Sequence, residues 1–187
     1  GQVVVLGGGN VAVDAACTAL RLGAESVAIA YRRTRGEMPA WAEEVEFAEE
    51  EGVNLVFLLS PAEVLQADGK ARGVRMTKMR LADDDASGRP RPVPSGEPDV
   101  TIEADTVVLA FGQAPNESVF SSLPSLARSD AGMIAVDAET GATSVAGVFA
   151  GGDAVNGGTT VVQAVGEGLR TAEGIRAYLD SATPARN

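Results

Sequence analysis

The order of an apolar strand, a glycine turn and a helix at the start of the chain most restricts its fold. The apolar run Val3–Leu6 is followed at once by Gly7–Gly9 and then by a helical pattern over about 10–22. A second apolar run covers 27–31. Such runs are typical of strands buried on both faces of a parallel sheet. Two parallel strands joined by a helix form a βαβ unit, so the sequence predicts an α/β domain.

The glycine turn matches a dinucleotide fingerprint, with Gly7, Gly9 and Ala12 at the diagnostic positions. Gly7 allows the tight turn, Gly9 lets the backbone approach a pyrophosphate, and Ala12 lets the helix pack closely on the strand. The start of the helix then offers unpaired N–H groups and a partial positive charge to the phosphates. A tight turn without a ligand is the alternative. We therefore predict that Gly7–Gly9 binds the pyrophosphate of a dinucleotide.

The end of the second strand distinguishes between cofactors. An NAD site usually has an acid there, which binds the ribose 2′-hydroxyl. This chain has Arg32 and Arg33 instead, and the nearest acid, Glu37, lies beyond them. Guanidinium groups suit a 2′-phosphate, which they can bind bidentately. The sequence thus predicts NADPH, with NADH or a merely solvent-exposed basic turn as alternatives.

The next segment continues the alternation of helix and strand. Pro39 opens a helical pattern in which Trp41, Val45 and Ala48 are spaced to face the core. Residues 54–59 then read as a third strand.

A change to period-two spacing follows. Strand signals surround Asp68-Gly69 and predict a β-meander over 62–103. We expect the polar segment Asp83–Pro98, rich in Pro and Gly, to form a long mobile hairpin loop within it. Thr106–Phe111 is again a continuous apolar strand, and it ends at Gly112.

The C-terminal part predicts a strand, a turn and a long helix. The strand covers Gly147–Ala150, and the helix runs from about Thr160 to Leu179. Between them Asp153 can offer its carboxylate to sugar hydroxyls, and the helix start can face the carbonyl edge of a flavin; a plain Asx turn is the alternative. We expect the tail Ser181–Asn187 to be disordered. One face of the helix is apolar: Val161, Val165, Leu169, Ala172, Ile175 and Leu179.

Composition excludes several classes of function. A formal net charge of −11 argues against a nucleic-acid binder that uses a basic face. The chain has no histidine, the commonest general base. Its single cysteine, Cys17, excludes an internal disulfide and a cysteine-ligated metal cluster, and it reads as a packed core thiol. No apolar run is long enough for a membrane span, and a cytoplasmic setting fits.

These motifs together resemble the small (beta) subunit of NADPH-dependent glutamate synthase and related flavoproteins with two dinucleotide-binding domains. The resemblance covers essentially the whole chain and rests on Leu6–Asp14, Tyr31–Arg33 with Met38-Pro39, Gly88–Pro94, Ala110–Gln113 and Gly147–Asp153. In that family an FAD domain is split around an inserted NADPH domain. The resemblance therefore implies a three-layer Rossmann-like NAD(P)-binding domain with a β-meander at 1–112. It implies the strand–helix piece of a split FAD-binding domain, with the disordered tail, at 113–187.

The same resemblance implies which residues bind the two cofactors. Those for the pyrophosphate of NADPH are Gly7, Gly8, Gly9, Asn10 and Val11, and those for its 2′-phosphate are Arg32 and Arg33. Those for FAD are Gly152 and Asp153 at the ribityl–phosphate region and Thr160 and Val161 near the isoalloxazine. Gly112, at the return crossing between the domains, is a further cofactor-binding residue that is not assigned to either cofactor. No residue is assigned a catalytic or metal-binding role.

The implied activity is part of an oxidoreductase. NADPH would pass hydride to FAD, and electrons would continue to Fe–S centres or to an electron-accepting partner such as a large synthase subunit. A non-catalytic NADP-binding module and an NADH-dependent version are the alternatives. Because the chain lacks an initiator Met and a second Gly-x-Gly-x-x-Gly unit, we interpret it as a C-terminal piece whose partner is a missing N-terminal FAD and Fe–S segment. Alone, residues 147–179 would repack on the NADPH domain or in a homodimer.

Overall fold

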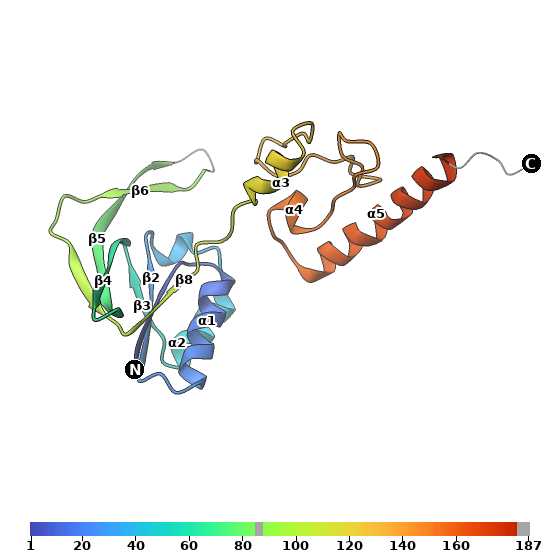
Figure 1. The fold of residues 1–187 in the computed structure, drawn as a ribbon. Coiled ribbons are helices and arrows are strands. Elements are labelled where there is room, and N and C mark those ends of the chain that lie inside the picture. Colours follow the sequence, from blue (N-terminus) through green and yellow to red (C-terminus); the bar gives the residue numbers. More distant parts are fainter. Residues whose placement is uncertain (85–87, 183–187) are drawn as a thin grey trace, which may run out of the picture. The chain divides into compact units, whose positions relative to one another are not determined.

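The computed structural model describes residues 1–84 and 88–182 (Figure 1). The chain divides into two compact units, Gly1–Gly112 and a second that begins at Gln113. In the first unit the elements are β1 (Gln2–Leu6), α1 (Asn10–Arg21), β2 (Ser26–Tyr31), the 3-10 helix η1 (Arg35–Glu37), α2 (Ala42–Glu50), β3 (Asn54–Phe57), β4 (Leu59–Ala67), β5 (Lys70–Asp84), β6 (Pro90–Pro94), β7 (Val100–Glu103) and β8 (Thr106–Leu109).

A parallel sheet forms the centre of the first unit, with the strand order β3-β2-β1-β8. In its register Val4 of β1 is paired with Ala28 of β2 and Val107 of β8. β1 lies between two neighbours and is covered on both faces, so it has an apolar run rather than alternation. The carboxyl ends of parallel strands lie along one edge of the sheet. The glycine turn after β1 and the arginines after β2 therefore share that edge.

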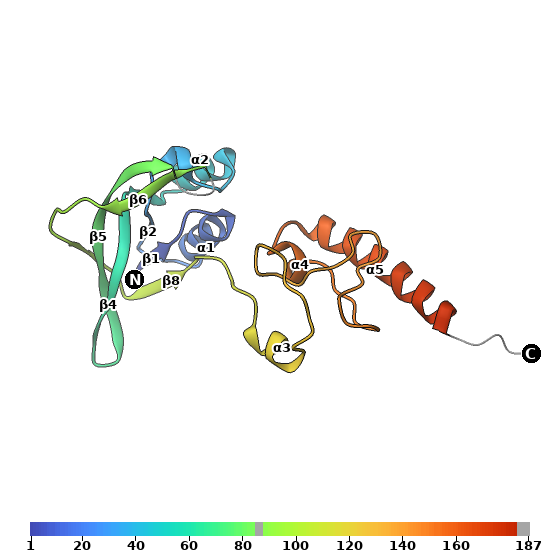
Figure 2. The same ribbon diagram turned by 90° about the horizontal axis from the view of Figure 1, so that it is seen from above.

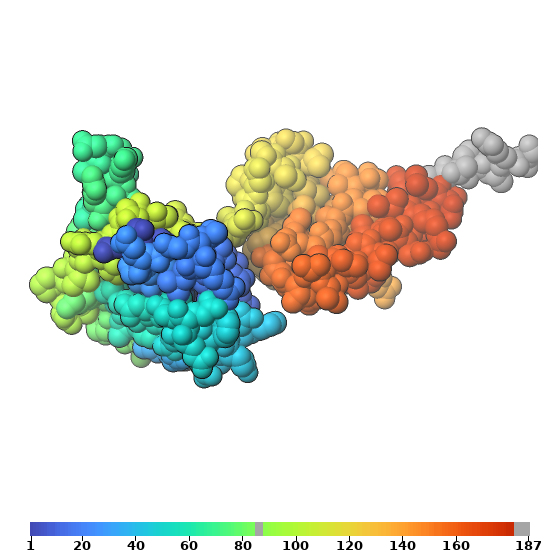
Figure 3. Space-filling model, turned by 90° about the horizontal axis from the view of Figure 1, so that it is seen from below, coloured from blue at the N-terminus to red at the C-terminus, as the bar shows by residue number. Residues whose placement is uncertain are grey.

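The sheet is the middle of three layers (Figure 2). On one face α1 and α2 lie next to each other, as Figure 3 also shows, and Val5 packs under them. On the other face Val4 and Leu6 pack against Val74 and Met76 of the second sheet. Successive residues of β1 thus belong to opposite cores, as the period of a strand requires. The predicted three-layer α/β fold is confirmed.

The second sheet is antiparallel and joins the first through a strained residue. β5 pairs with β4, β6 and β7, and the β4–β5 hairpin turns at Asp68-Gly69 with φ values of 53° and 72°. Positive φ at both residues defines the tight turn that suits a twisted hairpin. Between the sheets, Leu58 has φ 57°; its N–H donates to the Arg33 carbonyl at 3.1 Å, and its carbonyl accepts from Met79 N–H at 2.8 Å.

The prediction of a long loop over Asp83–Pro98 is wrong in part. β5 continues to Asp84, and β6 pairs with it antiparallel, Arg91 opposite Ala82 and Val93 opposite Arg80. Proline lacks a backbone donor, and in sheets it is confined to edge strands. β6 has proline at every second position and lies at the edge of its sheet. Reading proline as a loop signal therefore missed an edge strand. The part of this prediction at 85–87 lies outside the described residues.

The prediction that Trp41 faces the core is also wrong. Val45 and Ala48 are buried as predicted, but Trp41 is 62% exposed. α2 begins at Ala42, and Trp41 precedes it as the N-cap with extended φ and ψ of −64° and 134°. A residue outside the helix does not follow the helical phase, so the spacing to Val45 carried no information about its side chain.

The second unit contains α3 (Glu117–Ser122), α4 (Asp153–Asn156), α5 (Val161–Ala182) and irregular backbone between them. Arg128 pairs with Glu117 and lies 3.6 Å above the ring of Phe120, which is buried. The strand predicted at Gly147–Ala150 is reduced to an isolated bridge from Phe149 to Ala142. A stable strand needs neighbouring strands with which to pair. Among the described residues, Gly147–Ala150 pairs only at Phe149, so it does not form a strand.

Helix α5 packs through Gly174, Tyr178 and polar residues rather than through its predicted apolar face. A Cβ at Gly174 would lie 2.1 Å from the Thr140 carbonyl oxygen, and the Tyr178 ring contacts Phe149 edge to face at 5.7 Å. The predicted apolar face exists but is exposed, with Val161 at 80% and Leu169 at 67%. Ser181 and Ala182, placed in the predicted disordered tail, belong to α5, and the remainder lies outside the described residues. Among the described helices none combines the length and apolarity needed to cross a membrane.

Met76 tests the contact between the two sheets. It is fully buried against Val4 and Leu6, so Met76→Ala removes apolar contacts and leaves a cavity. We expect a loss of about 2–5 kcal/mol in the free energy of unfolding, measured by urea denaturation. Val64→Ala, at a 37% exposed position of β4, is the control and should cost less than about 1 kcal/mol. Equal losses would mean that the sheets do not share a core.

Candidate dinucleotide-binding site

The three glycines after β1 are required for different reasons. Gly7 has φ 151°, and a Cβ there would lie 2.4 Å from the Ala110 carbonyl oxygen. A Cβ at Gly8 would lie 2.5 Å from the Tyr31 ring. At Gly9, by contrast, φ is −93° and a Cβ would meet only Pro39, at 3.9 Å. Packing within the chain accounts for Gly7 and Gly8. It leaves open space beside Gly9, where a close approach of backbone to ligand requires glycine.

Segment 38–41 holds the glycine turn from one side. The Ala40 N–H donates to the Gly8 carbonyl at 3.2 Å, and the Trp41 N–H donates to Asn10 Oδ1 at 3.0 Å. The Asn10 side chain thus satisfies an N–H at the start of α2, and the contact predicted between Asn10 and the pyrophosphate would fall to its backbone N–H. This pair of bonds was not anticipated from the sequence, because the partners are about 30 residues apart.

The beginning of α1 presents backbone donors beside Gly9. The first bonds to an acceptor in this turn are those from Ala12 and Val13 N–H to the Gly9 carbonyl, at 2.9 and 3.3 Å. Asn10 and Val11 precede them, and the first N–H groups of a helix have no intrahelical acceptor. Val11 is 69% exposed, so this turn is accessible. Open space, free donors and the positive end of the helix dipole coincide at Gly9–Val11, an arrangement that suits a phosphate.

The two adjacent arginines differ in environment. Arg33 is 3% exposed, and its Nε donates to the Pro90 carbonyl of β6 at 2.8 Å. Arg32 is exposed, and in the described parts of the chain its guanidinium has neither a hydrogen-bond partner nor an ion pair. Arg35 pairs with Glu49 of α2 at 2.6 Å. Of this basic cluster, Arg32 is therefore the cation available to an incoming anion.

Glu37, the nearest acid, is engaged within its own turn. Its carboxylate accepts from the Thr34 backbone N–H at 3.0 Å and from the Thr34 hydroxyl, which forms a capping box around η1. The hydrogen bond from the Thr34 side chain lowers the pKa of Glu37, and the charge of Arg33 contributes. The Tyr31 hydroxyl donates to the Glu37 carbonyl at 2.8 Å and fixes this turn beside Gly8. The Glu37 carboxylate already accepts hydrogen bonds from Thr34. It is therefore poorly suited to bind a ribose hydroxyl.

In the second unit, Glu167 organises the Gly-Gly-Asp turn. Its carboxylate accepts from Gly152 N–H at 2.6 Å and from Asn156 Nδ2 at 3.0 Å. These two hydrogen bonds lower the pKa of Glu167, and the bond from Asn156 has the larger effect. Gly152 has φ 66° and is buried, whereas Asp153 is exposed, and its carboxylate has no partner among the described residues. Sequence reasoning missed Glu167, because it lies 15 residues after Gly152 and 11 after Asn156, the residues that donate to it.

The remaining predicted cofactor-binding residues lie at the start of α5 and, for Gly112, at the end of the first unit. Thr160 caps α5, because its hydroxyl accepts from the Gln163 N–H at 3.3 Å, and Val161 is 80% exposed. Gly112 has φ 85°, and a Cβ there would contact nothing within 4 Å. Thr160 and Val161 belong to the same unit as Asp153, whereas Gly112 is the last residue of the first unit.

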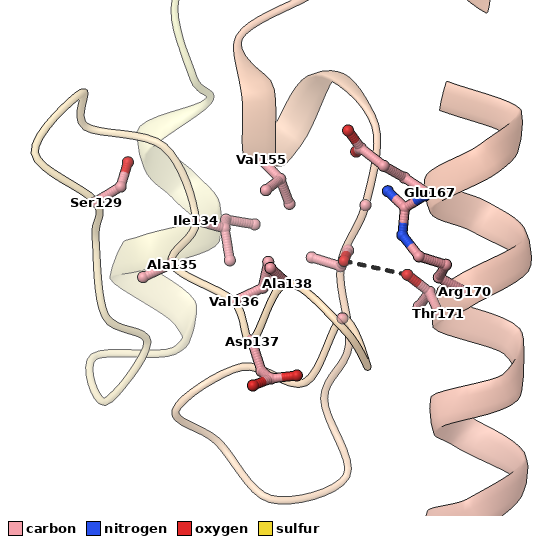
Figure 4. A pocket seen from close by; sticks show the side chains of 13 residues that line it. Ser129, Ile134, Ala135, Val136, Asp137, Ala138, Val155, Glu167, Arg170 and Thr171 are labelled. Carbon is pink, nitrogen blue, oxygen red and sulfur yellow. Dashed lines mark hydrogen bonds between the residues drawn. The ribbon is translucent and has the colours of Figure 1, made fainter. Parts of the chain in front are cut away.

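A cavity of about 330 Å³ lies in the second unit beside the Gly-Gly-Asp turn, since Gly151 and Glu167 belong to its lining (Figure 4). Ile134, Val136 and Val155 form one wall, and Glu167 and Arg170 of α5 face them. None of the predicted site residues lines this cavity. The described residues also include no group of three or more His, Cys, Asp or Glu side chains arranged to hold a metal ion.

Residues 1–168 match a protein-family model described as pyridine nucleotide-disulphide oxidoreductase. Among curated proteins, the chain is 47% identical over 181 residues to the NADP(+)-dependent formate dehydrogenase subunit beta of Moorella thermoacetica. It is 42% identical over 179 residues to the glutamate synthase [NADPH] small chain of Azospirillum brasilense. These alignments cover 97% and 95% of this chain but only 25% and 37% of the relatives. The chain thus spans well under half the length of these relatives.

Solved structures share the fold at lower identity. The chain is similar to thioredoxin reductase from T. acidophilum, with a TM-score of 0.74 and 24% identity. The match covers 97% of this chain and 53% of that one. FprA from Mycobacterium tuberculosis, solved in complex with NADPH, gives a TM-score of 0.69 at 18% identity and covers 97% and 53%.

Gly7 and Gly9 allow a matched comparison within one turn. Gly7→Ala forces a Cβ against the Ala110 carbonyl at a φ that L-residues rarely adopt, so we expect a loss of roughly 3 kcal/mol in the free energy of unfolding. Gly9→Ala meets open space and should cost about 1 kcal/mol or less. It should nevertheless weaken dinucleotide binding, measured by calorimetric titration. Retained binding in Gly9→Ala would contradict the location of the pyrophosphate.

The lowered pKa of Glu167 predicts a loss of stability in acid. Because the folded state favours the charged carboxylate, this contribution is complete above the ordinary glutamate pKa of about 4.3 and is lost as the pH falls through the lower folded value. Glu167→Gln removes this group, while the other carboxylates titrate equally in both proteins. The difference in unfolding free energy between wild type and variant should therefore shrink from about pH 6 to pH 3. A constant difference would show that Glu167 is not held as a carboxylate.

Proposed function

The chain belongs to the pyridine nucleotide-disulphide oxidoreductase family, and from this we propose that it binds NADPH as part of a flavin-dependent oxidoreductase. The first unit would bind the nicotinamide dinucleotide. The second would contribute one part of an FAD site. The relatives whose names include NADPH or NADP(+) support the choice of cofactor, and their alignments include both units.

One observation carries the proposal: the open space at Gly9 lies on the same sheet edge as Arg32, which is exposed and has no hydrogen-bond or ion-pair partner among the described residues. The backbone donors of Asn10 and Val11 would bind the pyrophosphate, and Arg32 would bind the 2′-phosphate. Glu37 supports NADPH over NADH, because its carboxylate is already bonded to Thr34. We assign Arg33 a positioning role, since its buried guanidinium joins the end of β2 to β6 through Pro90.

The second unit fits part of a flavin site by its donor set. Asp153 is exposed on a turn that Glu167 holds through Gly152, so its carboxylate is free to accept hydrogen bonds from sugar hydroxyls. The capped start of α5 offers N–H groups near Thr160 and Val161. When both cofactors are bound, the chemistry that they supply is hydride transfer between nicotinamide and flavin. That step requires positioned rings rather than a protein acid or base, so the role of these side chains would be to bind and orient.

The names of the relatives also suggest a partner. One is a formate dehydrogenase subunit and another a glutamate synthase small chain. We infer that this chain acts within an assembly that contains an electron-accepting subunit or domain, with Fe–S centres as the carriers proposed between them.

Calorimetric titration of the chain with NADP⁺ and NAD⁺ tests the cofactor assignment. We expect wild type to bind NADP⁺ at least tenfold more tightly than NAD⁺. Arg32→Ala should weaken NADP⁺ by about 1.5–3 kcal/mol, the range for hydrogen bonds to charged groups, and leave NAD⁺ unchanged.

Arg33→Ala is the comparison for that titration. Because Arg33 is buried, its removal should lower the free energy of unfolding, whereas Arg32→Ala should leave it within about 0.5 kcal/mol of wild type. If Arg32→Ala weakens NADP⁺ and NAD⁺ equally, Arg32 does not bind the 2′-phosphate. If neither dinucleotide binds wild type, the proposed function is wrong for this chain.

A further inference from the structure

Trp41 is the single tryptophan of the chain, and it is 62% exposed. A large aromatic side chain gains stability from burial, and tryptophan is highly buried on average. Here the backbone of Trp41 is fixed as the N-cap of α2, while its indole is left in solvent. The fold therefore leaves most of the area of this side chain uncovered.

The position of Trp41 relates it to the glycine turn. Its N–H donates to Asn10 Oδ1 at 3.0 Å, and Asn10 is the first residue of α1. The N–H of the preceding residue, Ala40, donates to the Gly8 carbonyl at 3.2 Å. The residue before that is Pro39, and its side chain lies 3.9 Å from the place where a Cβ on Gly9 would be. Three consecutive residues thus border the open space beside Gly9, and the third carries the exposed indole.

The direction of the chain identifies which half of a dinucleotide would lie here. Segment 32–41 begins at Arg32, which lies at the end of β2, and ends at Trp41 beside the start of α1. In a fold of this kind the adenosine ribose lies at the end of β2 and the pyrophosphate at the start of α1. The adenosine half of NADPH carries the 2′-phosphate that Arg32 would bind. Its remaining group is adenine, a flat ring suited to stacking on an indole.

We propose that Trp41 is a binding residue for the adenine of the dinucleotide, with its indole stacked on the purine. This inference rests on the proposed function, because it requires NADPH to occupy the glycine turn. It assigns a role to a side chain that neither the phosphate contacts nor the core accounts for. Since stacking recognises the ring and not the phosphate, Trp41 should strengthen the binding of NADP⁺ and NAD⁺ to a similar degree, unlike Arg32.

The single tryptophan makes the test direct, because the indole fluorescence of the 187-residue chain comes from this residue alone. We expect NADP⁺ and adenosine 2′,5′-bisphosphate to quench it and nicotinamide mononucleotide to leave it unchanged. In calorimetric titrations Trp41→Ala should bind both NADP⁺ and NAD⁺ about 5- to 160-fold more weakly than wild type, the range for base–aromatic stacking. Trp41→Phe, which keeps a smaller ring, should recover part of that loss.

Phe47→Ala is the matched control, since Phe47 is 50% exposed on α2, the helix that Trp41 precedes, and its ring lies beneath Arg21. It should leave both affinities unchanged. Wild-type binding of NADP⁺ with an unaltered affinity in Trp41→Ala would overturn the role of Trp41 and leave the proposed function intact; the indole would then belong to a protein-contact surface. Quenching by nicotinamide mononucleotide alone would place the wrong ring at Trp41. No binding of NADP⁺ to wild type would overturn both.

Discussion

Close packing around Gly7 and Gly8 fixes the path of the chain from β1 to α1, and the candidate site depends on this path. The Ala110 carbonyl confines the turn at Gly7, and the Tyr31 ring confines it at Gly8. Tyr31 is itself held by its hydrogen bond to Glu37, and segment 38–41 bonds to Gly8 and Asn10. The turn is thus enclosed on the sides that face the protein. The side left open is that of Gly9, where the first N–H groups of α1 emerge.

The adjacent arginines lie in the bend that follows β2, and the tertiary structure gives them opposite environments. Arg33 is buried, and Arg32 is exposed. Arg33 is directed inward, where a buried charge must have hydrogen-bonding partners, and it donates to Pro90 of β6. Arg32 is directed outward and keeps its guanidinium in water. The second sheet therefore takes part in building the basic edge, since β6 supplies the acceptor that holds Arg33 in place.

The second unit combines a well-fixed turn with a helix whose apolar face is exposed. Glu167, Thr171 and Gly174 lie on the packed side of α5, where small and polar contacts let the helix approach Gly152, Ala150 and Thr140 closely. The opposite face, with Val161 and Leu169, has no cover among the described residues. The relatives are much longer than this chain. A helix that is apolar on its exposed side is typical of a surface that another segment or protein covers.

The sequence alone determined the parallel α/β layer, because Val3–Leu6, the glycine turn and the run at 27–31 are local patterns with local causes. It also determined the β4–β5 hairpin, since Asp68-Gly69 favours a tight turn by its own conformational preferences. It did not determine β6, whose prolines indicate a loop until an edge strand is available, nor the exposure of Trp41, which depends on where α2 begins. Only the tertiary structure separated Arg32 from Arg33, gave Gly7, Gly8 and Gly9 different neighbours, and brought Glu167 to Gly152. Each of these outcomes depends on a contact between residues far apart in the chain, and a pattern within one segment carries no information about the partner that folding brings to it.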